Sequence, residues 1–359
     1  MKHLVYLIDG TWQAAHSDIA HETYSNVYQL NVYLEATDSA GNPQIVFYTR
    51  GIGSGRGLSK YTGGALADGI DDMIAEVYIN ICSNYQEGDK IYLFGFSRGG
   101  VVARAVAALI DSAGLLAASR MRLFRNAWDY FTGYDRSEHN RHILESATYV
   151  GRDIEFLGAF DVVFGSDHRR TSLVSRLRFV DPDLETCVRN AVHIMCLDDK
   201  RRGFSPILWG KPKRDDQYLE QIWLPGVHSD VGGVYRENAL GMVALLTMVD
   251  RVCQRTSLRF DVDEFNHIYN MLKSMFFDTP VVINNELVGI WRYLRRSKRT
   301  LVSEAHGQVL HPIVGHCQTA SIAWKGGKSL SGYRLHNSFS DMALMDDCKL
   351  FPFGDDFID

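Results

Sequence analysis

The chain is poor in cysteine, and its cysteines form no motif. Six cysteines are spread over 359 residues, and no CxxC pair or Cys/His pair has the spacing of metal ligands. Such pairs are the usual sequence sign of a zinc site or a redox centre. We therefore predict no metal site and no cofactor. We interpret the cysteines as buried free thiols, which suit a reducing cytosol.

An excess of positive charge and long apolar runs are also missing. With 38 Lys and Arg against 43 Asp and Glu, the bulk charge gives no sign of a nucleic-acid partner. The longest apolar run, 101–118, contains Arg104 and Asp111, which predicts a buried helix rather than a membrane span. The N-terminal apolar run reaches Asp9 too soon for a signal peptide. We expect a protein made in the cytoplasm, without a signal peptide or transmembrane segment.

The chain does contain short apolar strands that alternate with helical patterns. Strands are predicted at 4–8, 44–48, 90–94, 154–160 and 221–224, helices at 64–85, 100–116 and 239–273, and a helix running into a strand at 187–196. This alternation is typical of an α/β fold whose mostly parallel sheet is covered by helices on both faces. We predict an α/β-hydrolase-like fold, a single domain over 1–359, and a helical insertion or cap at 236–300.

A serine between two glycines follows the predicted strand at 90–94. In Gly95-Phe96-Ser97-Arg98-Gly99 the glycines stand two residues before and two after the serine. A sharp turn from strand to helix needs glycine at both places, because Cβ atoms there would clash. The motif is common by chance, but here it lies between a predicted strand and a predicted helix. We predict Ser97 as a catalytic nucleophile.

A serine nucleophile needs a histidine that takes its proton. His228 follows the predicted strand at 221–224, within a glycine-rich loop. The carboxyl ends of parallel strands are where such sheets carry their chemistry. His193 is the weaker candidate, because it lies inside an apolar run. We predict His228 as the catalytic base.

An acid is needed to orient the histidine, and in this fold class the chain order is Ser, acid, His. Asp161 stands at the end of the predicted strand at 154–160, between the serine and the histidine. Asp230 is the rival, although it would have to fold back onto His228, and Asp198 or Asp199 come third. We predict Asp161 as the acid. Asp230 is then expected to brace the histidine loop through backbone hydrogen bonds.

The oxyanion formed during acyl transfer needs two N–H donors. One is predicted at the backbone N–H of Arg98, at the start of a helix. The other is predicted in the loop Asp9-Gly10-Thr11-Trp12, from Gly10 or Thr11. Asp9 is expected to pin this loop.

With these motifs the sequence resembles an α/β-hydrolase family, long filed as a domain of unknown function, that includes the first group of type VI secretion phospholipase effectors. The matching segments occur in the family's order at residues 9–12, 24–27, 48–53, 95–99, 157–163 and 225–233. The chain departs from the family at Gln13, where Asn is common, and at Phe160, where Trp is frequent. Neither change removes a catalytic group. The resemblance implies a triad of Ser97, Asp161 and His228.

The resemblance also implies phospholipase activity, with a membrane glycerophospholipid or another lipid ester as substrate. It leaves open whether the chain is exported by a dedicated secretion system or acts as an intracellular effector. It also leaves open which regulatory or immunity protein binds the chain. Three other functions remain open from the residues. These are a soluble carboxylesterase or thioesterase, a metal-dependent hydrolase with Asp9, His228 and Asp230 as ligands, and a non-enzymatic interaction module.

A dense basic cluster interleaved with aromatic residues lies at 291–299. Aromatic rings suit the headgroup layer of a membrane, and basic side chains are attracted to anionic lipids. The cluster predicts peripheral membrane contact. A solvated helix face or a subunit contact explains the same pattern equally well.

Overall fold

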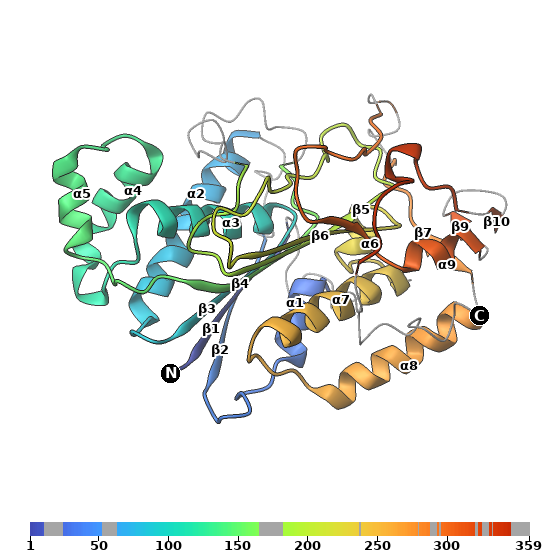
Figure 1. Cartoon of the computed structure of the whole chain (residues 1–359), viewed down its shortest axis with the longest axis horizontal. Coiled ribbons are helices and arrows are strands. Elements are labelled where there is room, and N and C mark those ends of the chain that lie inside the picture. Colours follow the sequence, from blue (N-terminus) through green and yellow to red (C-terminus); the bar gives the residue numbers. More distant parts are fainter. Residues whose placement is uncertain are drawn as a thin grey trace.

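The computed structural model describes residues 1–10, 24–51, 63–164, 182–236, 238–278, 280–287, 293, 296–319, 322–324, 330–331 and 333–345. Its centre is a seven-stranded sheet in the order β2-β1-β3-β4-β5-β6-β8, and every pair of neighbours is parallel (Figure 1). The strands are β1 (His3–Ile8), β2 (Gln44–Thr49), β3 (Lys90–Phe96), β4 (Ile154–Phe160), β5 (Asn190–Cys196), β6 (Tyr218–Leu224) and β8 (Gln308–Leu310). The α/β-hydrolase-like fold predicted from the sequence is confirmed.

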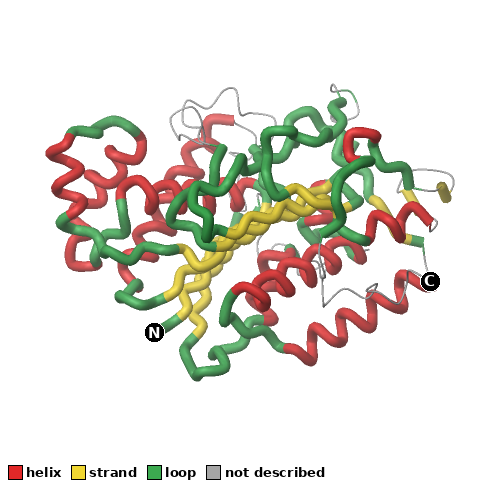
Figure 2. Tube along the Cα trace, viewed as in Figure 1, coloured by secondary structure: helices red, strands yellow, loops and turns green. Residues whose placement is uncertain are grey.

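Helices cover both faces of the sheet, as predicted (Figure 2). Side chains alternate along each strand, so β1 sends Leu4, Tyr6 and Ile8 to one face and Val5 and Leu7 to the other. The first face packs against α2 (Gly63–Asn84) and α3 (Arg98–Ala113), with α4 (Phe124–Thr132) and α5 (Glu138–Glu145) further out. The second face packs against α1 (Asn26–Tyr33) and α7 (Ala239–Arg255). Two-sided burial explains why the strands read as continuous apolar runs.

The remaining elements belong mostly to the last third of the chain. They are η2 (Ala118–Leu123), α6 (His228–Val231), α8 (Val262–Asp278), β7 (Val281–Ile283), α9 (Ile313–Thr319), β9 (Ile322–Trp324), β10 (Leu330–Ser331) and η4 (Asn337–Phe339). The strands β10, β9 and β7 form a small second sheet. The segment predicted as a helical insertion, 236–300, contains α7 on the main sheet, α8 packed on α7, and β7.

Two local predictions are wrong. The helix predicted before the strand at 187–196 is absent among these described residues, because β5 begins at Asn190 and bonds to β4 and β6 on both sides. The helix predicted over 239–273 is broken after Arg255. There the chain becomes extended, buries Phe260 in the core and bridges to Leu34 after α1. In both places tertiary pairing overrides the local helical pattern.

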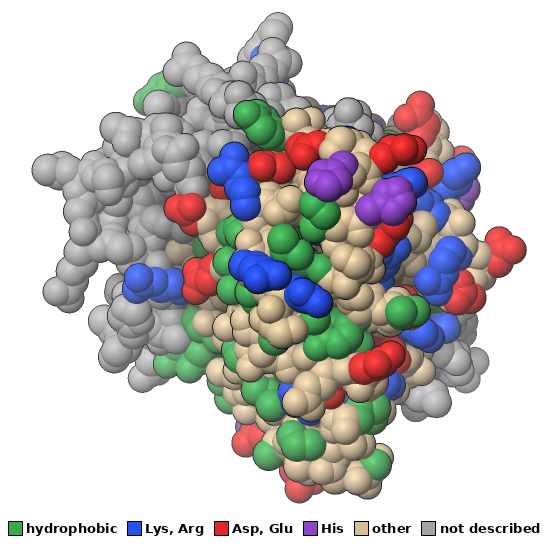
Figure 3. Space-filling model, turned by 90° about the vertical axis from the view of Figure 1, so that its left-hand side faces the viewer, with side chains coloured by type: hydrophobic (Ala, Val, Ile, Leu, Met, Phe, Trp, Pro, Cys, Tyr) green, Lys and Arg blue, Asp and Glu red, His purple; other side chains and the backbone are tan. Residues whose placement is uncertain are grey.

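The surface of the described part carries both signs of charge. Acidic and basic side chains are interspersed over the face in Figure 3, in keeping with a net charge of −5. Within the described residues, no helix combines the length and apolar character that a membrane span requires.

Candidate active site

The turn between β3 and α3 holds Ser97 in a backbone conformation that residues with a side chain rarely adopt. Its φ is 56° and its ψ is −122°. A Cβ on Gly95 would lie 2.5 Å from the backbone nitrogen of Gly100, and a Cβ on Gly99 would overlap the carbonyl oxygen of Ile8. The two glycines therefore let strand and helix approach closely enough to raise the serine at the sheet edge.

The structure brings Ser97, Asp161 and His228 together at the carboxyl edge of the sheet. His228 Nε2 lies 3.0 Å from Ser97 Oγ, and His228 Nδ1 lies 2.6 Å from Asp161 Oδ2. The three residues follow β3, β4 and β6, and all are buried. Since parallel strands end at one edge, segments far apart in the sequence meet here. The ring of Phe96 stacks on His228 at 4.8 Å between centroids.

Asp161 has a positive φ of 41°. Two backbone N–H groups, its own and that of the next residue, fix it by hydrogen bonds. Its N–H donates to the carbonyl of Ile194 at 2.7 Å, and the next N–H, of Val162, donates to His193 Nε2 at 3.0 Å. Burial lowers the pKa of His193 to about 3, so this ring is neutral and serves as an acceptor. His193, the weaker candidate for the base, therefore supports the loop of the acid.

Arg299 is a residue of the site that the sequence did not reveal. Its guanidinium donates to both carboxylate oxygens of Asp161, at 2.5 and 2.9 Å, and also to the carbonyls of Cys196 and Phe204. Burial alone would raise the pKa of the Asp161 carboxyl. The charge of Arg299 and the hydrogen bonds from His228 and Arg299 outweigh burial and hold that pKa below its usual range. Asp161 is therefore a carboxylate shared between a histidine and an arginine.

This contact corrects part of the prediction for the basic cluster at 291–299. Arg299 was grouped with surface residues, but it is only 6% exposed. Tyr293 is 84% exposed, and Arg296 and Lys298 are exposed as well. Residues 291–292 and 294–295 lie outside the described residues. Composition alone cannot separate Arg299 from its neighbours, because the acid that draws it inward is 138 residues away.

The loop that starts at Asp9 is held by the carboxylate of that residue. Asp9 Oδ2 accepts hydrogen bonds from Ser25 Oγ at 2.7 Å and Tyr48 OH at 2.8 Å, while Oδ1 accepts from Gly10 N at 2.7 Å. Burial raises the pKa of Asp9, against the effect of these three bonds. The Gly10 N–H, predicted as an oxyanion donor, thus already has an acceptor. Thr11, the other predicted donor, lies outside the described residues.

Glycine is needed at position 10 for packing against Phe96. A Cβ on Gly10 would lie 2.5 Å from the ring of Phe96.

Arg98 is the first residue of α3. Backbone N–H groups in the first turn of a helix have no partner within the helix and form the positive end of its dipole. This position suits a group that stabilises negative charge beside Ser97.

Asp230 braces the histidine loop and does not contact the imidazole. Its Oδ2 accepts from Val227 N at 2.9 Å, and Oδ1 accepts from Asn284 Nδ2 at 2.6 Å. Burial raises its pKa to about 6, although these bonds oppose the rise. Asp9 and Asp230 thus belong to hydrogen-bond networks separate from that of His228. Among the described residues, no three His, Cys, Asp or Glu side chains are grouped as metal ligands.

The two remaining acid candidates support the same loop from the end of β5. Asp198 Oδ2 accepts from Gly226 N at 2.8 Å. Asp199 Oδ2 lies 3.4 Å from the backbone N of His228 and pairs with Arg201. Both carboxylates therefore bind the backbone next to the histidine rather than its ring.

The chain has detectable relatives. The sequence model described as the Tle1-like phospholipase effector catalytic domain of the type VI secretion system matches residues 2–251. The uncharacterized protein YEL023C of Saccharomyces cerevisiae is 26% identical over 227 residues, which cover 57% of this chain and 32% of that protein.

Two solved structures are also similar. The Tle1 effector bound to the VgrG spike from the type VI secretion system has a TM-score of 0.39 and 19% identity, over 66% of this chain and 51% of that one. An uncharacterized protein from Pseudomonas aeruginosa has a TM-score of 0.41 and 17% identity, over 72% and 46%. This chain spans about a third of the yeast relative and about half of each solved chain.

The family match confirms the resemblance that the sequence motifs predicted. It extends over residues 2–251 and so includes the segments that carry Ser97, Asp161 and His228. The chain belongs to the Tle1-like phospholipase effector family of the type VI secretion system.

Proposed function

We propose that this chain is a serine hydrolase that cleaves the carboxylic esters of glycerophospholipids. The observation that carries the proposal is the unbroken hydrogen-bonded chain from Ser97 Oγ through both nitrogens of His228 to Asp161, with distances of 3.0 and 2.6 Å. Nucleophile, base and acid occur in the order of the α/β-hydrolases. Family membership supports a lipid ester as the substrate.

The chemistry follows from this arrangement. Ser97 Oγ attacks the ester carbonyl carbon while its proton passes to His228 Nε2. Asp161 keeps the other ring nitrogen protonated and stabilises the imidazolium that forms. His228 then gives the proton to the leaving alcohol oxygen, and the acyl group stays on Ser97. Water repeats both steps, so that the acid product leaves and the serine is restored.

The oxyanion that forms in each step is bound by backbone N–H groups. The Arg98 N–H, at the start of α3, is the first donor in this proposal. The Gly10 N–H already donates to Asp9, and Thr11, the other predicted donor, lies outside the described residues. The loss of one such donor costs about 10²- to 10³-fold in kcat in serine hydrolases.

The test compares Ser97→Ala with Ser112→Ala, an exposed serine on the same helix. Ser97→Ala is expected to lose labelling by a fluorophosphonate and at least about 10³-fold in turnover, because triad residues act as a unit. Lipid analysis of phospholipid vesicles should show lysophospholipid and free fatty acid with the wild type and with Ser112→Ala only. Labelling that persists in Ser97→Ala would contradict the serine mechanism.

The same assays decide between substrates. A soluble carboxylesterase or thioesterase would hydrolyse short monomeric esters and leave vesicles intact. Absence of labelling and of hydrolysis would favour an interaction module. Family membership also supports an effector role, in which membrane lipids of a target cell are attacked and components of the secretion system are the partners.

A further inference from the structure

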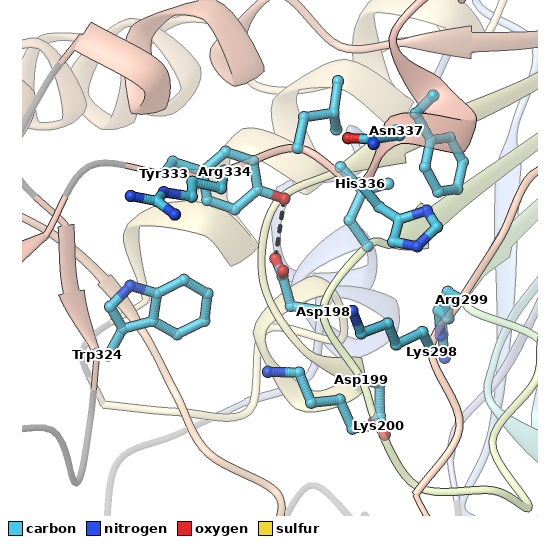
Figure 4. A pocket seen from close by; sticks show the side chains of 13 residues that line it. Asp198, Asp199, Lys200, Lys298, Arg299, Trp324, Tyr333, Arg334, His336 and Asn337 are labelled. Atoms are coloured by element: carbon cyan, nitrogen blue, oxygen red, sulfur yellow. Dashed lines mark hydrogen bonds between the residues drawn. The ribbon is translucent and has the colours of Figure 1, made fainter.

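A second feature near the same sheet edge is a pocket of about 750 Å³ whose lining includes Arg299, the partner of Asp161 (Figure 4). One wall is the segment after β5, one is the pair Lys298 and Arg299, and one is the chain around η4. The pocket is lined by Leu197, Asp198, Asp199, Lys200, Lys298, Arg299, Trp324, Tyr333, Arg334, Leu335, His336, Asn337 and Phe339. Its volume is in the range of small-molecule sites.

The charges of the pocket favour an anion. Arg299 is bound to Asp161, and Asp199 is bound to Arg201. Three cations remain, Lys200, Lys298 and Arg334, and none has a carboxylate within salt-bridge distance among the residues that the structure describes. Asp198 is the single acidic group left against them. In a chain with a net charge of −5, three cations against one acidic group, counted over the described lining residues, are a local property of this pocket.

The pocket also has an aromatic side. The rings of Trp324 and Tyr333 stack at 6.4 Å with an angle of 12°, and Lys200 Nζ lies 5.7 Å from the Trp324 ring. Tyr333 OH donates to Asp198 at 3.1 Å. Aromatic walls lower the local dielectric, and charge–charge attraction is stronger there than in open solvent. Figure 4 shows the labelled side chains arranged around Asp198.

The pocket is joined to the catalytic residues by two contacts. Asp198 accepts from the N–H of Gly226, two residues before His228. Arg299 lines the pocket and binds Asp161. A ligand bound here would therefore touch the groups that hold both the acid and the histidine loop.

We propose that this pocket binds a phosphate group, carried by a phospholipid headgroup or by a soluble phosphate ester. A phosphate offers negative charge and hydrogen-bond acceptors to Lys200 and Lys298. The headgroup source rests on the proposed phospholipase function, and the soluble source does not. Burial raises the pKa of Asp198 to about 6, against the bonds from Gly226 and Tyr333, so its opposing charge weakens in mild acid.

Calorimetry with inorganic phosphate and glycerol 3-phosphate tests the proposal. The double variant Lys200→Gln/Lys298→Gln is compared with Lys211→Gln/Lys273→Gln, which removes two exposed lysines outside the pocket. We expect Kd to rise about tenfold in the first and to stay unchanged in the second. Asp198→Asn keeps an acceptor for Gly226 and removes the negative charge, so Kd should fall about threefold. Equal Kd in wild type and Lys200→Gln/Lys298→Gln, or no saturable binding, overturns the proposal.

Kinetics then distinguish the two sources. If the headgroup is the ligand, Lys200→Gln/Lys298→Gln raises KM for phospholipid micelles above that of Lys211→Gln/Lys273→Gln, and glycerol 3-phosphate competes with the phospholipid. If a soluble ester is the ligand, glycerol 3-phosphate changes the rate on the neutral ester in the wild type. A wild type that binds phosphate but hydrolyses no ester would refute the proposed function and leave the pocket assignment standing.

Discussion

Asp161 has no exposure to solvent, and its charge is divided between His228 and Arg299. Without Arg299, Oδ1 of this carboxylate would keep the backbone N–H of Cys196, at 3.2 Å, as its hydrogen-bond donor among the described residues. Arg299 donates to both carboxylate oxygens and is itself fixed by two carbonyls. Breaking a buried ion pair by removing one partner costs about 3–5 kcal/mol, because the other charge remains buried.

Arg299 is therefore expected to be a positioning residue that acts through Asp161. Arg299→Gln should lower kcat on a monomeric ester about 10²-fold with little change in KM, since Asp161 loses its fixed orientation. Arg299→Lys keeps the charge and one hydrogen bond, and should recover part of the loss. Arg296→Gln, on an exposed neighbour, is the control. Wild-type kcat in Arg299→Gln, with only a lower unfolding free energy, would mean that Arg299 serves folding alone.

The residues that could be predicted are those with a local signature. Ser97 has its flanking glycines, and Asp161 and His228 each follow a strand. Arg299 has no such signature, because an arginine in a basic segment looks the same whether it is buried or exposed. The acceptor of the Gly10 N–H could not be predicted for a similar reason, because it depends on the side-chain conformation of Asp9.

At the scale of elements, the turn from β3 to α3 sets the geometry of the site. Close contact of α3 with β1 is possible only because Gly99 has no side chain facing the carbonyl of Ile8. Strand positions could be predicted well, because burial on both faces leaves long apolar runs. The break between α7 and α8 could not, because the pairing of Phe260 with Leu34 depends on a segment far away in the sequence.

Gly99→Ala is expected to destabilise the fold by roughly 3 kcal/mol or more, since the added methyl group meets backbone rather than a movable side chain. Gly315→Ala is the matched control. Its Cβ would have no atom within 4 Å, and alanine favours α9, so stability should rise by about 0.5–1 kcal/mol. Urea unfolding of both variants checks the pair. Similar unfolding free energies would mean that the turn relaxes to accept the methyl group.

At the scale of the whole molecule, the proposed phospholipase activity requires a chain with a net charge of −5 to contact an anionic lipid surface. The exposed part of the cluster at 291–299, with Arg296 and Tyr293, is the surface predicted to make this contact. Arg299 is not part of this surface, because it is buried. Each basic residue near an anionic membrane contributes about 1 kcal/mol.

Arg295→Gln/Arg296→Gln should therefore weaken binding to anionic vesicles roughly tenfold at low salt, and hydrolysis of a monomeric ester should stay at the wild-type rate. Arg125→Gln/Arg141→Gln, with the same loss of charge at exposed positions elsewhere, serves as the control. Vesicle sedimentation measures the binding. Unchanged sedimentation, or equal losses on both substrates, would assign the cluster to assembly or folding.

The ion pair of Asp161 with Arg299 joins two residues that lie far apart in the sequence. The family match ends at residue 251, so the matched region contains Ser97, Asp161 and His228 but not Arg299, the counter-ion of Asp161. The matched region also lacks β8, the strand that completes one edge of the main sheet. Without residue 299, the buried carboxylate of Asp161 lacks the two hydrogen bonds from Arg299. The segment matched by the family is thus shorter than the segment that supplies the contacts of Asp161, which are complete only when the chain extends to residue 299.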